Sequence, residues 1–135
     1  MGVEGINGSV DIAVSGLRAQ SRRLNAISSN IANASTTRTA EGGPYRRRDV
    51  VLATEGDEIS GVTVQHVGPD LSTDFKRVHM PGHPDANESG YVLMPNVSLP
   101  QEMMSLVVAS RAYQANAAVL KRYQEMVNVT LELLR

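Results

Sequence analysis

Cysteine and tryptophan are absent from the sequence, and aromatic side chains are scarce: the 135 residues include one phenylalanine and four tyrosines. Without cysteine the chain can form neither disulfides nor thiolate metal sites, and it has no cysteine nucleophile. So few aromatic rings do not make a stacking platform for single-stranded nucleic acid. The net charge of −1 also offers no strong attraction for a polyanion. We therefore expect no nucleic-acid partner.

Long hydrophobic runs are absent as well. No segment approaches the roughly 18 consecutive apolar residues that a membrane span requires, and we expect no insertion into a membrane. The first residues, Met1–Gly5, lack the basic and apolar regions of a secretory signal peptide. A cleaved signal is therefore not expected.

The chain also lacks a recognisable set of catalytic or metal-binding residues. His79 and His83 are four residues apart, but Pro81 and Gly82 would break the helix that such a metal pair needs. The acidic residues at 57–58 and within 70–74 fall in loop-like segments, where carboxylates remain solvated. No serine–histidine–aspartate set, HExxH motif or phosphate-binding loop is present. We predict a protein without enzymatic activity, metal or cofactor.

What the sequence does contain is hydrophobic periodicity at both ends. From about residue 8 to residue 34, the spacing alternates between three and four residues, which predicts a helix with a coiled-coil seam. Asn7 or Ser9 would cap this helix, and Ser35–Thr37 would end it. The seam comprises Val10, Ala13, Leu17, Gln20, Leu24, Ile27 and Ile31. A second face is small enough for another helix to approach closely and carries Ile12, Ala19 and Ala26.

A longer helix is predicted from residue 98 to residue 135, with Ser98 and Gln101 as a capping box and Pro100 in the first turn. Its main apolar stripe keeps the four-three step over five heptads. The stripe comprises Leu99, Met103, Leu106, Ser110, Tyr113, Ala117, Leu120, Gln124, Val127, Leu131 and Leu134. These two seams favour pairing of the terminal helices as a coiled coil.

The same long helix carries a second apolar stripe on its opposite side. The stripe comprises Met104, Val108, Ala115, Val119, Met126, Val129 and Leu133. A helix with two apolar faces must be covered on both. The first helix can cover one face and the middle of the chain is too short to cover the other, so we expect the second stripe to meet other subunits. We also expect residues 1–35 and 98–135 to be largely disordered in a dilute monomer.

The middle of the chain is rich in glycine, proline and β-branched residues and predicts short strands joined by turns. The predicted strands are Asp49–Ala53, Val62–Val67, Lys76–Met80 and Tyr91–Met94. They would form a small β domain or arm with little core of its own. We predict a mainly α fold with a small β insert, divided into an N-terminal helix at 1–36, the insert at 37–97 and a C-terminal helix at 98–135.

Two groups of polar residues are candidates for contacts between subunits. Arg46, Arg47 and Arg48 are consecutive, so a strand would point them alternately to opposite faces. They form either a solvated edge that blocks stray strand pairing or salt bridges to an acidic loop of a neighbouring subunit, and the sequence favours neither. Asparagines at 30, 33, 116 and 128 serve either as caps and surface residues or as register-setting hydrogen bonds between packed helices.

Segments at both ends resemble the signatures of one known family. The N-terminal signature lies in SGLRAQ at Ser15–Gln20, in Leu24 and in SNIAN at Ser29–Asn33. The C-terminal signature lies in Glu102–Met103 and in ASRAYQAN at Ala109–Asn116. Together these segments resemble the flagellar basal-body rod and hook proteins. Within that group, four further segments resemble the C-type proximal rod proteins: Gly43–Arg47, Asp85–Asn87, Gly90–Val92 and Pro95–Val97.

The resemblance implies a structural subunit of the bacterial flagellum. The subunit would leave the cytoplasm unfolded through the flagellar type III export apparatus and assemble in the periplasm beneath the distal rod. Its terminal helices would line a hollow helical tube that transmits motor torque to the distal rod and hook. Its partners would be copies of itself, other rod proteins and, at the rod base, the membrane-ring and export-gate proteins.

The stripes and the matched motifs together predict the assembly residues. In the first helix these are Val10, Leu17, Gln20, Leu24, Ile27, Asn30, Ile31 and Asn33. In the second helix they are Leu99, Met103, Leu106, Tyr113, Gln114, Asn116, Leu120, Val127, Leu131 and Leu134.

Three alternative functions are open at this stage. The first is a different axial protein of the rod or hook, although such relatives usually carry larger middle insertions. The second is a helical-hairpin adaptor or export chaperone, which would form a closed dimer with both apolar stripes covered. The third is a small hydrolase, for which the sequence offers no triad.

Overall fold

The structure is a computed structural model that describes the backbone of residues 4–56 and 60–134 and the side chains of residues 8–56 and 60–134. The elements follow in the order α1 (Glu4–Ala32), β1 (Arg48–Thr54), β2 (Val62–Pro69), β3 (Lys76–His79), β4 (Tyr91–Met94) and α2 (Leu99–Leu133). The mainly α fold with a small antiparallel β insert is thus confirmed. The acidic pair at 57–58 lies outside the described residues.

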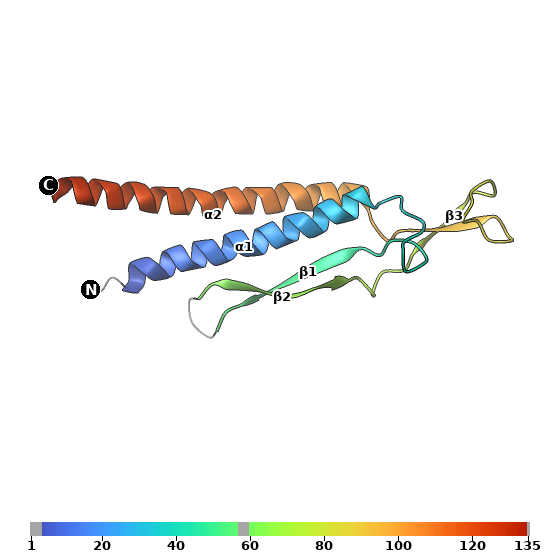
Figure 1. Cartoon of the computed structure of the whole chain (residues 1–135), viewed down its shortest axis with the longest axis horizontal. Coiled ribbons are helices and arrows are strands. Elements are labelled where there is room, and N and C mark those ends of the chain that lie inside the picture. The colour runs from blue at the N-terminus through green and yellow to red at the C-terminus, as the bar shows by residue number, and fades with distance from the viewer. Residues whose placement is uncertain (1–3, 57–59, 135) are drawn as a thin grey trace.

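The molecule is elongated, with α1 in its middle. Helix α2 runs antiparallel to α1 on one side, and the β1–β2 hairpin lies along the other side of α1 (Figure 1). The β3–β4 hairpin projects from the end where α2 begins, opposite to the end where α2 finishes (Figure 1). One end of the molecule therefore combines all of these elements, whereas the other end consists of the helices and the parts of β1 and β2 around Thr54 and Val62 (Figure 1).

Helix α1 begins at Glu4, so the predicted start near residue 8 is wrong. Asn7 and Ser9 consequently lie inside the helix and do not cap it. A helix continues through residues of low propensity once it is nucleated, and the glycines at 5 and 8 do not interrupt it. The other end agrees with prediction: the helix stops at Ala32, and backbone turns follow from Asn33.

Helix α2 begins with Ser98 as its N-cap, but the predicted capping box is not formed, because the Ser98 side chain makes no capping hydrogen bond. The backbone N–H of Glu102 donates to the Ser98 carbonyl over 2.9 Å instead. Pro100 lies in the first turn, where its missing N–H has no helical partner to lose. The first turn is held by the Glu102 side chain, which is buried against the rest of the subunit.

All of the predicted strands are present, and they pair in two separate antiparallel hairpins, β1 with β2 and β3 with β4. A bulge between Val51 and Leu52 shifts the register of the first hairpin. Val50 of β1 and Val92 of β4 are buried. Most other strand residues are exposed or half-buried, so each hairpin contributes only one or two side chains to the core.

The face of α2 that packs on α1 coincides only in part with the predicted stripe, of which Leu106 and Leu120 are half-buried. Ala109 is buried, whereas Leu99, Met103 and Tyr113 of the predicted seam are exposed. Small residues explain the difference, because they let two helix backbones approach more closely than large ones do. A Cβ atom placed on Gly16 would lie 2.7 Å from Nδ2 of Asn116, so the two helices are in close contact at this point.

The core is concentrated at the end where α2 begins. Its buried residues include Ala19, Ala26, Ile27, Asn30, Val50, Val92, Val97, Glu102 and Ala109. Beyond Ala109, no described residue of α2 is buried, and residues 124–134 are all exposed. The subunit therefore covers one end of its long helix and leaves the other end bare.

Candidate assembly interface

Four polar side chains, which we call the polar junction, connect both helices with the segment that enters β1. They are Asn30, Tyr45, Arg47 and Glu102. The Asn30 amide nitrogen donates to the Arg48 carbonyl over 2.8 Å and to the Glu102 carboxylate over 3.1 Å. Its Oδ1 accepts from the Arg48 N–H and from the Tyr45 hydroxyl. Every hydrogen-bonding group of this buried amide is therefore satisfied, which fixes the register of α1 against β1 and α2.

Glu102 is 1% exposed and lies at the centre of the junction. Nε of Arg47 donates to its Oε1 over 2.7 Å, and Asn30 donates to its other oxygen. Burial acts to lower the pKa of Arg47, but the hydrogen bond to Glu102 and the charges of Glu102, Asp49 and Asp70 raise it above its ordinary value. A buried carboxylate is tolerated only with such partners, so this ion pair commits the helices to one arrangement.

Arg46 and Asn96 extend the hydrogen-bond network to the turn between β2 and β3. A guanidinium nitrogen of Arg46 donates to the carbonyls of Asp70 and Thr73, and its charged group lies 4.1 Å from the centre of the Phe75 ring. The Asn96 amide donates to the same two carbonyls and accepts from the Arg47 N–H. The turn is thereby fastened to the polar junction at both of its ends.

The three consecutive arginines thus have different surroundings. Arg46 and Arg47 use their guanidinium groups within the subunit. Arg48 is exposed, and its side chain makes no ion pair with any other described residue. The pairing of this run with other subunits stays a prediction, and Arg48 is the member best placed for it.

A second connection joins α1 to the far part of the β1–β2 hairpin. The Ser15 hydroxyl donates to the Ile12 carbonyl over 2.7 Å and accepts from the Val62 N–H over 2.9 Å. Gly61 leaves the space for this approach, because a side chain there would collide with Ser15. The hairpin is therefore held along α1 and not only at its base.

The predicted assembly residues of α1 lie mostly against the rest of the subunit. Ile27 and Asn30 are buried, and the half-buried members are Val10, Leu17, Gln20, Leu24, Ile31 and Asn33. Asn33 ends the helix by donating from its side chain to the Ser29 carbonyl. Oε1 of Gln20 is buried without a hydrogen-bond partner among the described residues.

The predicted assembly residues of α2 are mostly on its surface. Leu106, Asn116 and Leu120 are half-buried, and the exposed members are Leu99, Met103, Tyr113, Gln114, Val127, Leu131 and Leu134. The second apolar stripe is exposed at each of its predicted positions: Met104, Val108, Ala115, Val119, Met126, Val129 and Leu133. A single subunit thus leaves both predicted stripes of α2 largely uncovered.

Sequence reasoning did not identify four residues that hold the interface in place: Tyr45, Asn96, Glu102 and Ala109. All four lie in the segments that resemble the family, but no physical role follows from the sequence for any of them. Glu102 could have been found from the sequence, because it is a charged residue among apolar ones in the first turn of the helix. Such a residue must be paired when it is buried.

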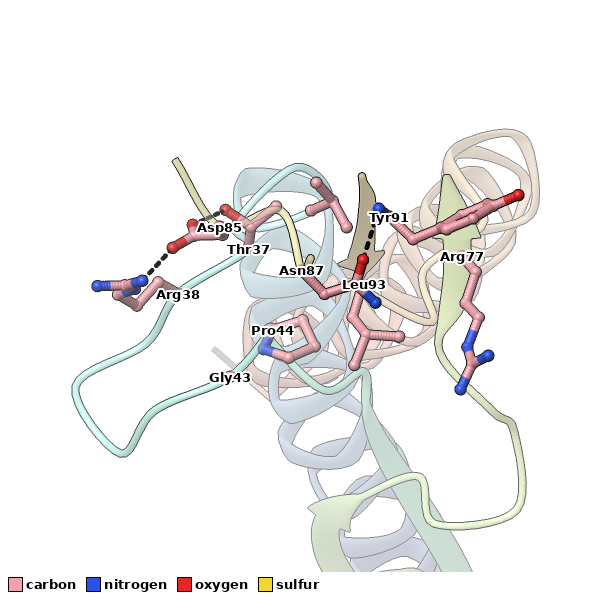
Figure 2. Close-up of a pocket in the computed structure, with 10 residues that line it drawn as sticks. Thr37, Arg38, Gly43, Pro44, Arg77, Asp85, Asn87, Tyr91 and Leu93 are labelled. Carbon is pink, nitrogen blue, oxygen red and sulfur yellow. Dashed lines mark hydrogen bonds and ion pairs between the residues drawn. The ribbon is translucent and has the colours of Figure 1, made fainter. Parts of the chain in front are cut away.

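A cleft of about 290 Å³ lies between the loop that follows α1 and the β3–β4 hairpin (Figure 2). Asp85 accepts from the Thr37 hydroxyl over 2.7 Å and pairs with Arg38, and these contacts hold the pKa of Asp85 below its ordinary value. Asn87 accepts from the Tyr91 N–H over 2.8 Å. The polar groups are thus engaged in holding the loop to the hairpin, and the arrangement includes no nucleophile with an adjacent base.

Other parts of the described chain offer no metal site or membrane span. Nδ1 of His83 accepts from the Asp85 N–H over 3.0 Å, and the rings of His79 and Tyr91 lie 5.0 Å apart, so both histidines have contacts within the hairpin. No group of three or more histidine or acidic side chains could hold a metal ion among the residues that the structure describes. Within the same residues, no helix has both the length and the apolar character needed to cross a membrane.

Known proteins match this chain over nearly its full length. Residues 88–133 match the family described as "Flagellar basal body rod FlgEFG protein C-terminal", and residues 11–38 match "Flagella basal body rod protein". The flagellar basal-body rod protein FlgC of Borreliella burgdorferi is 38% identical over 151 aligned positions, which cover 97% of this chain and 99% of that protein. The chain belongs to the FlgC family of flagellar basal-body rod proteins.

Two further FlgC proteins show comparable similarity. That of Yersinia enterocolitica is 44% identical, with 91% of this chain and 93% of that protein aligned. That of Bacillus subtilis is 37% identical, with 93% and 95% aligned. As a member of the FlgC family the chain is a structural subunit of the proximal rod, and its place is the flagellar basal body.

Proposed function

We propose that this rod subunit assembles through the exposed faces of α2, with the polar junction holding the helices and hairpins in one arrangement. The observation that carries the proposal is the bare end of α2. Residues 124–134 are all exposed, although they include Met126, Val127, Val129, Leu131 and Leu133. Continuous apolar surface of this kind marks a protein interface. The helices of neighbouring subunits would cover it in coiled-coil contacts and so build the wall of a hollow helical tube.

The partners that fit this surface are copies of the chain, other rod proteins and, at the base of the rod, membrane-ring and export-gate proteins. The subunit would reach the periplasm unfolded by type III export and fold as it joins the rod, which carries torque outward. In this function the predicted assembly residues of α2 pack between subunits, whereas those of α1 hold that helix in place within its own subunit. The protein needs neither a catalytic site nor a cofactor.

A closed helical adaptor is the alternative that the same exposed surface allows. It would cover α2 in a dimer of fixed size, whereas a rod subunit forms an open assembly with free surfaces at its ends. Size measurement over a range of concentrations separates the two. A sharp dimer at every concentration would support the adaptor.

The decisive experiment compares two aspartate substitutions on the exposed part of α2. Met126→Asp places a charge on the apolar arc, and Lys121→Asp places the same charge on the polar side with Glu125 and Glu132. Both side chains are exposed, so neither change should unfold the subunit. Burying the unpaired charge of Met126→Asp at an interface costs several kcal/mol, on the order of the penalty for a buried ion, and the helical assembly repeats this cost in every copy.

Cells that carry each variant in place of the native subunit would be scored for export, rods and swimming. We expect the Met126→Asp subunit to be exported without rod formation or motility, and Lys121→Asp cells to swim. Normal swimming of Met126→Asp cells would contradict assembly through this face.

A further inference from the structure

The turn between β2 and β3 presents a leucine to solvent. Leu71 is 77% exposed. A single exposed leucine is ordinary on a protein surface, but here the supporting turn, residues 70–74, is unusually well fixed. Oδ1 of Asp70 accepts from the N–H and hydroxyl of Ser72 and from the N–H of Thr73, and Arg46 and Asn96 bind the carbonyls of Asp70 and Thr73. Leu71 is therefore held outward before any partner arrives, which lowers the entropic cost of binding.

A groove of about 460 Å³ on the same subunit has the complementary chemistry. It lies between α1, β1 and α2. Its floor includes the buried residues Ile27, Val50 and Ala109, and one wall is formed by Met104 and Val108, which are exposed. The groove is thus an apolar recess that a branched aliphatic side chain would fill.

The charges around the leucine and the groove also match. Arg23 and Arg48 line the groove, and neither forms an ion pair with another described residue. Asp49 lies there too, but Arg47 is 3.7 Å from its carboxylate and offsets its charge. The Leu71 turn ends in Asp74, an exposed carboxylate without an ion pair to any described residue. An acidic turn bearing an aliphatic side chain therefore fits an apolar groove with arginines at its edge.

We propose that the Leu71 turn of one copy inserts into this groove of a neighbouring copy, with Asp74 facing Arg48. The inference rests on the proposed function and specifies one of its contacts. The Leu71 turn and the groove share no residue, so one copy can dock its turn in a neighbour and receive the turn of another copy in its own groove. Such a contact is heterologous and propagates into a ring or a helix, which is the geometry of a tube wall.

The absence of cysteine allows a direct test by cross-linking, because two introduced thiols are the only ones in this chain. Rods would be isolated from cells that carry Leu71→Cys with Val108→Cys and then oxidised mildly. We expect a ladder of dimers, trimers and larger species. Co-expression of the two single variants should give dimers only, because each subunit then has one thiol.

The matched control is Leu71→Cys with Leu131→Cys. Leu131 is also exposed on α2 but lies 22 residues beyond Ala109, about 33 Å away at 1.5 Å per residue. This pair should not form the ladder. Equal ladders from both pairs, or dimers of Leu71→Cys alone, would overturn the proposal, the latter by showing a symmetric contact. If cells that carry Leu71→Cys with Val108→Cys swim but their rods do not cross-link, this contact is wrong while the proposed function stands.

Charge reversal provides a second test if the cysteine pair fails to build rods. Arg48→Asp should reduce the number of rods, and adding Asp74→Arg to the same chain should restore them. Failure of the second change to restore assembly would count against the pairing of Arg48 with Asp74 and against this docking of the turn.

Discussion

The two ends of this subunit use the same long helices in opposite ways. Where α2 begins, α1, β1 and α2 meet around Asn30 and Glu102, each 1% exposed, and almost every polar group there has a partner. Where α2 ends, no described side chain from 124 to 134 is covered. The contacts at the first end fix the fold of one subunit. The second end offers an apolar surface to other subunits, because its side chains are buried only when a neighbour covers them.

Amide hydrogen exchange should show the largest difference between the two ends. In a monomeric sample, we expect amides at 103–116 to be protected at least about 100-fold more than those at 124–134, because local stability follows buried contacts. The sequence alone predicts rapid exchange throughout 1–35 and 98–135. Uniformly fast exchange along all of α2 would support that simpler view and remove the distinction between the ends.

Removing the Glu102 carboxylate should destabilise the subunit, because Glu102 lies at the covered end, where α2 begins. Glu102→Ala leaves Arg47 and Asn30 without their partner, and we expect a loss of about 2–4 kcal/mol in the free energy of unfolding, below the value for a fully buried pair because Arg47 is partly exposed. Met126→Ala on the bare end is the matched control and should change stability by less than about 0.5 kcal/mol. Denaturant titration measures both, and equal losses would contradict the comparison.

A second carboxylate in the polar junction should make stability depend on pH. Asn30→Asp places an acidic oxygen beside Glu102, where the existing amide contact is 3.1 Å. Repulsion raises the folded-state pKa of the pair above the unfolded value of about 4. Stability is then greater at low pH and is lost as pH rises through the raised pKa. Thermal melts from pH 4 to pH 8 would show this slope in the variant, and a flat curve would mean that the two side chains do not share one buried site.

The smallest effect concerns Asp70 in the Leu71 turn. Hydrogen bonds from Ser72 and Thr73 lower the pKa of this carboxyl to about 2. Because the folded pKa is depressed, its stabilising contribution is complete above pH of about 4 and is lost as pH falls towards 2. The amide resonances of Ser72 and Thr73 should titrate with a midpoint near 2. A midpoint near 4 would show that the turn is not held by these bonds.

Local signals predicted the elements of this fold better than their packing. The strands were located correctly because glycine and proline occur close to their ends: β2 stops at Pro69, and β3 stops at His79, two residues before Pro81 and Gly82. The capping box at Ser98 was not formed, since the first turn of α2 is positioned by Glu102, whose partners lie far away in sequence. Asn30 and Glu102 are separated by 72 residues, and no periodicity within one helix can pair them.

The packing face of α2 was also beyond prediction from periodicity. Two apolar stripes identify two faces that need cover, but they do not say which face the chain covers itself. The face that packs is decided by Gly16 and Ala109, whose small size lets the two helices approach closely. It is also decided by the polar junction, which requires Glu102 to face α1. The signature motifs nevertheless contained these residues, so the information was present without a physical reason attached to it.

The separation of Asn30 from Glu102 also affects when the subunit can fold. Closing a contact over 72 residues costs about 2 kcal/mol more entropy than closing the β1–β2 hairpin, since each doubling of loop length adds about 0.6 kcal/mol. A chain that emerges with its N-terminus first can form α1 and that hairpin early. The polar junction cannot form until Glu102 has also emerged. This long-range contact therefore delays folding, and the covered end reaches its final form only after about three-quarters of the chain is available.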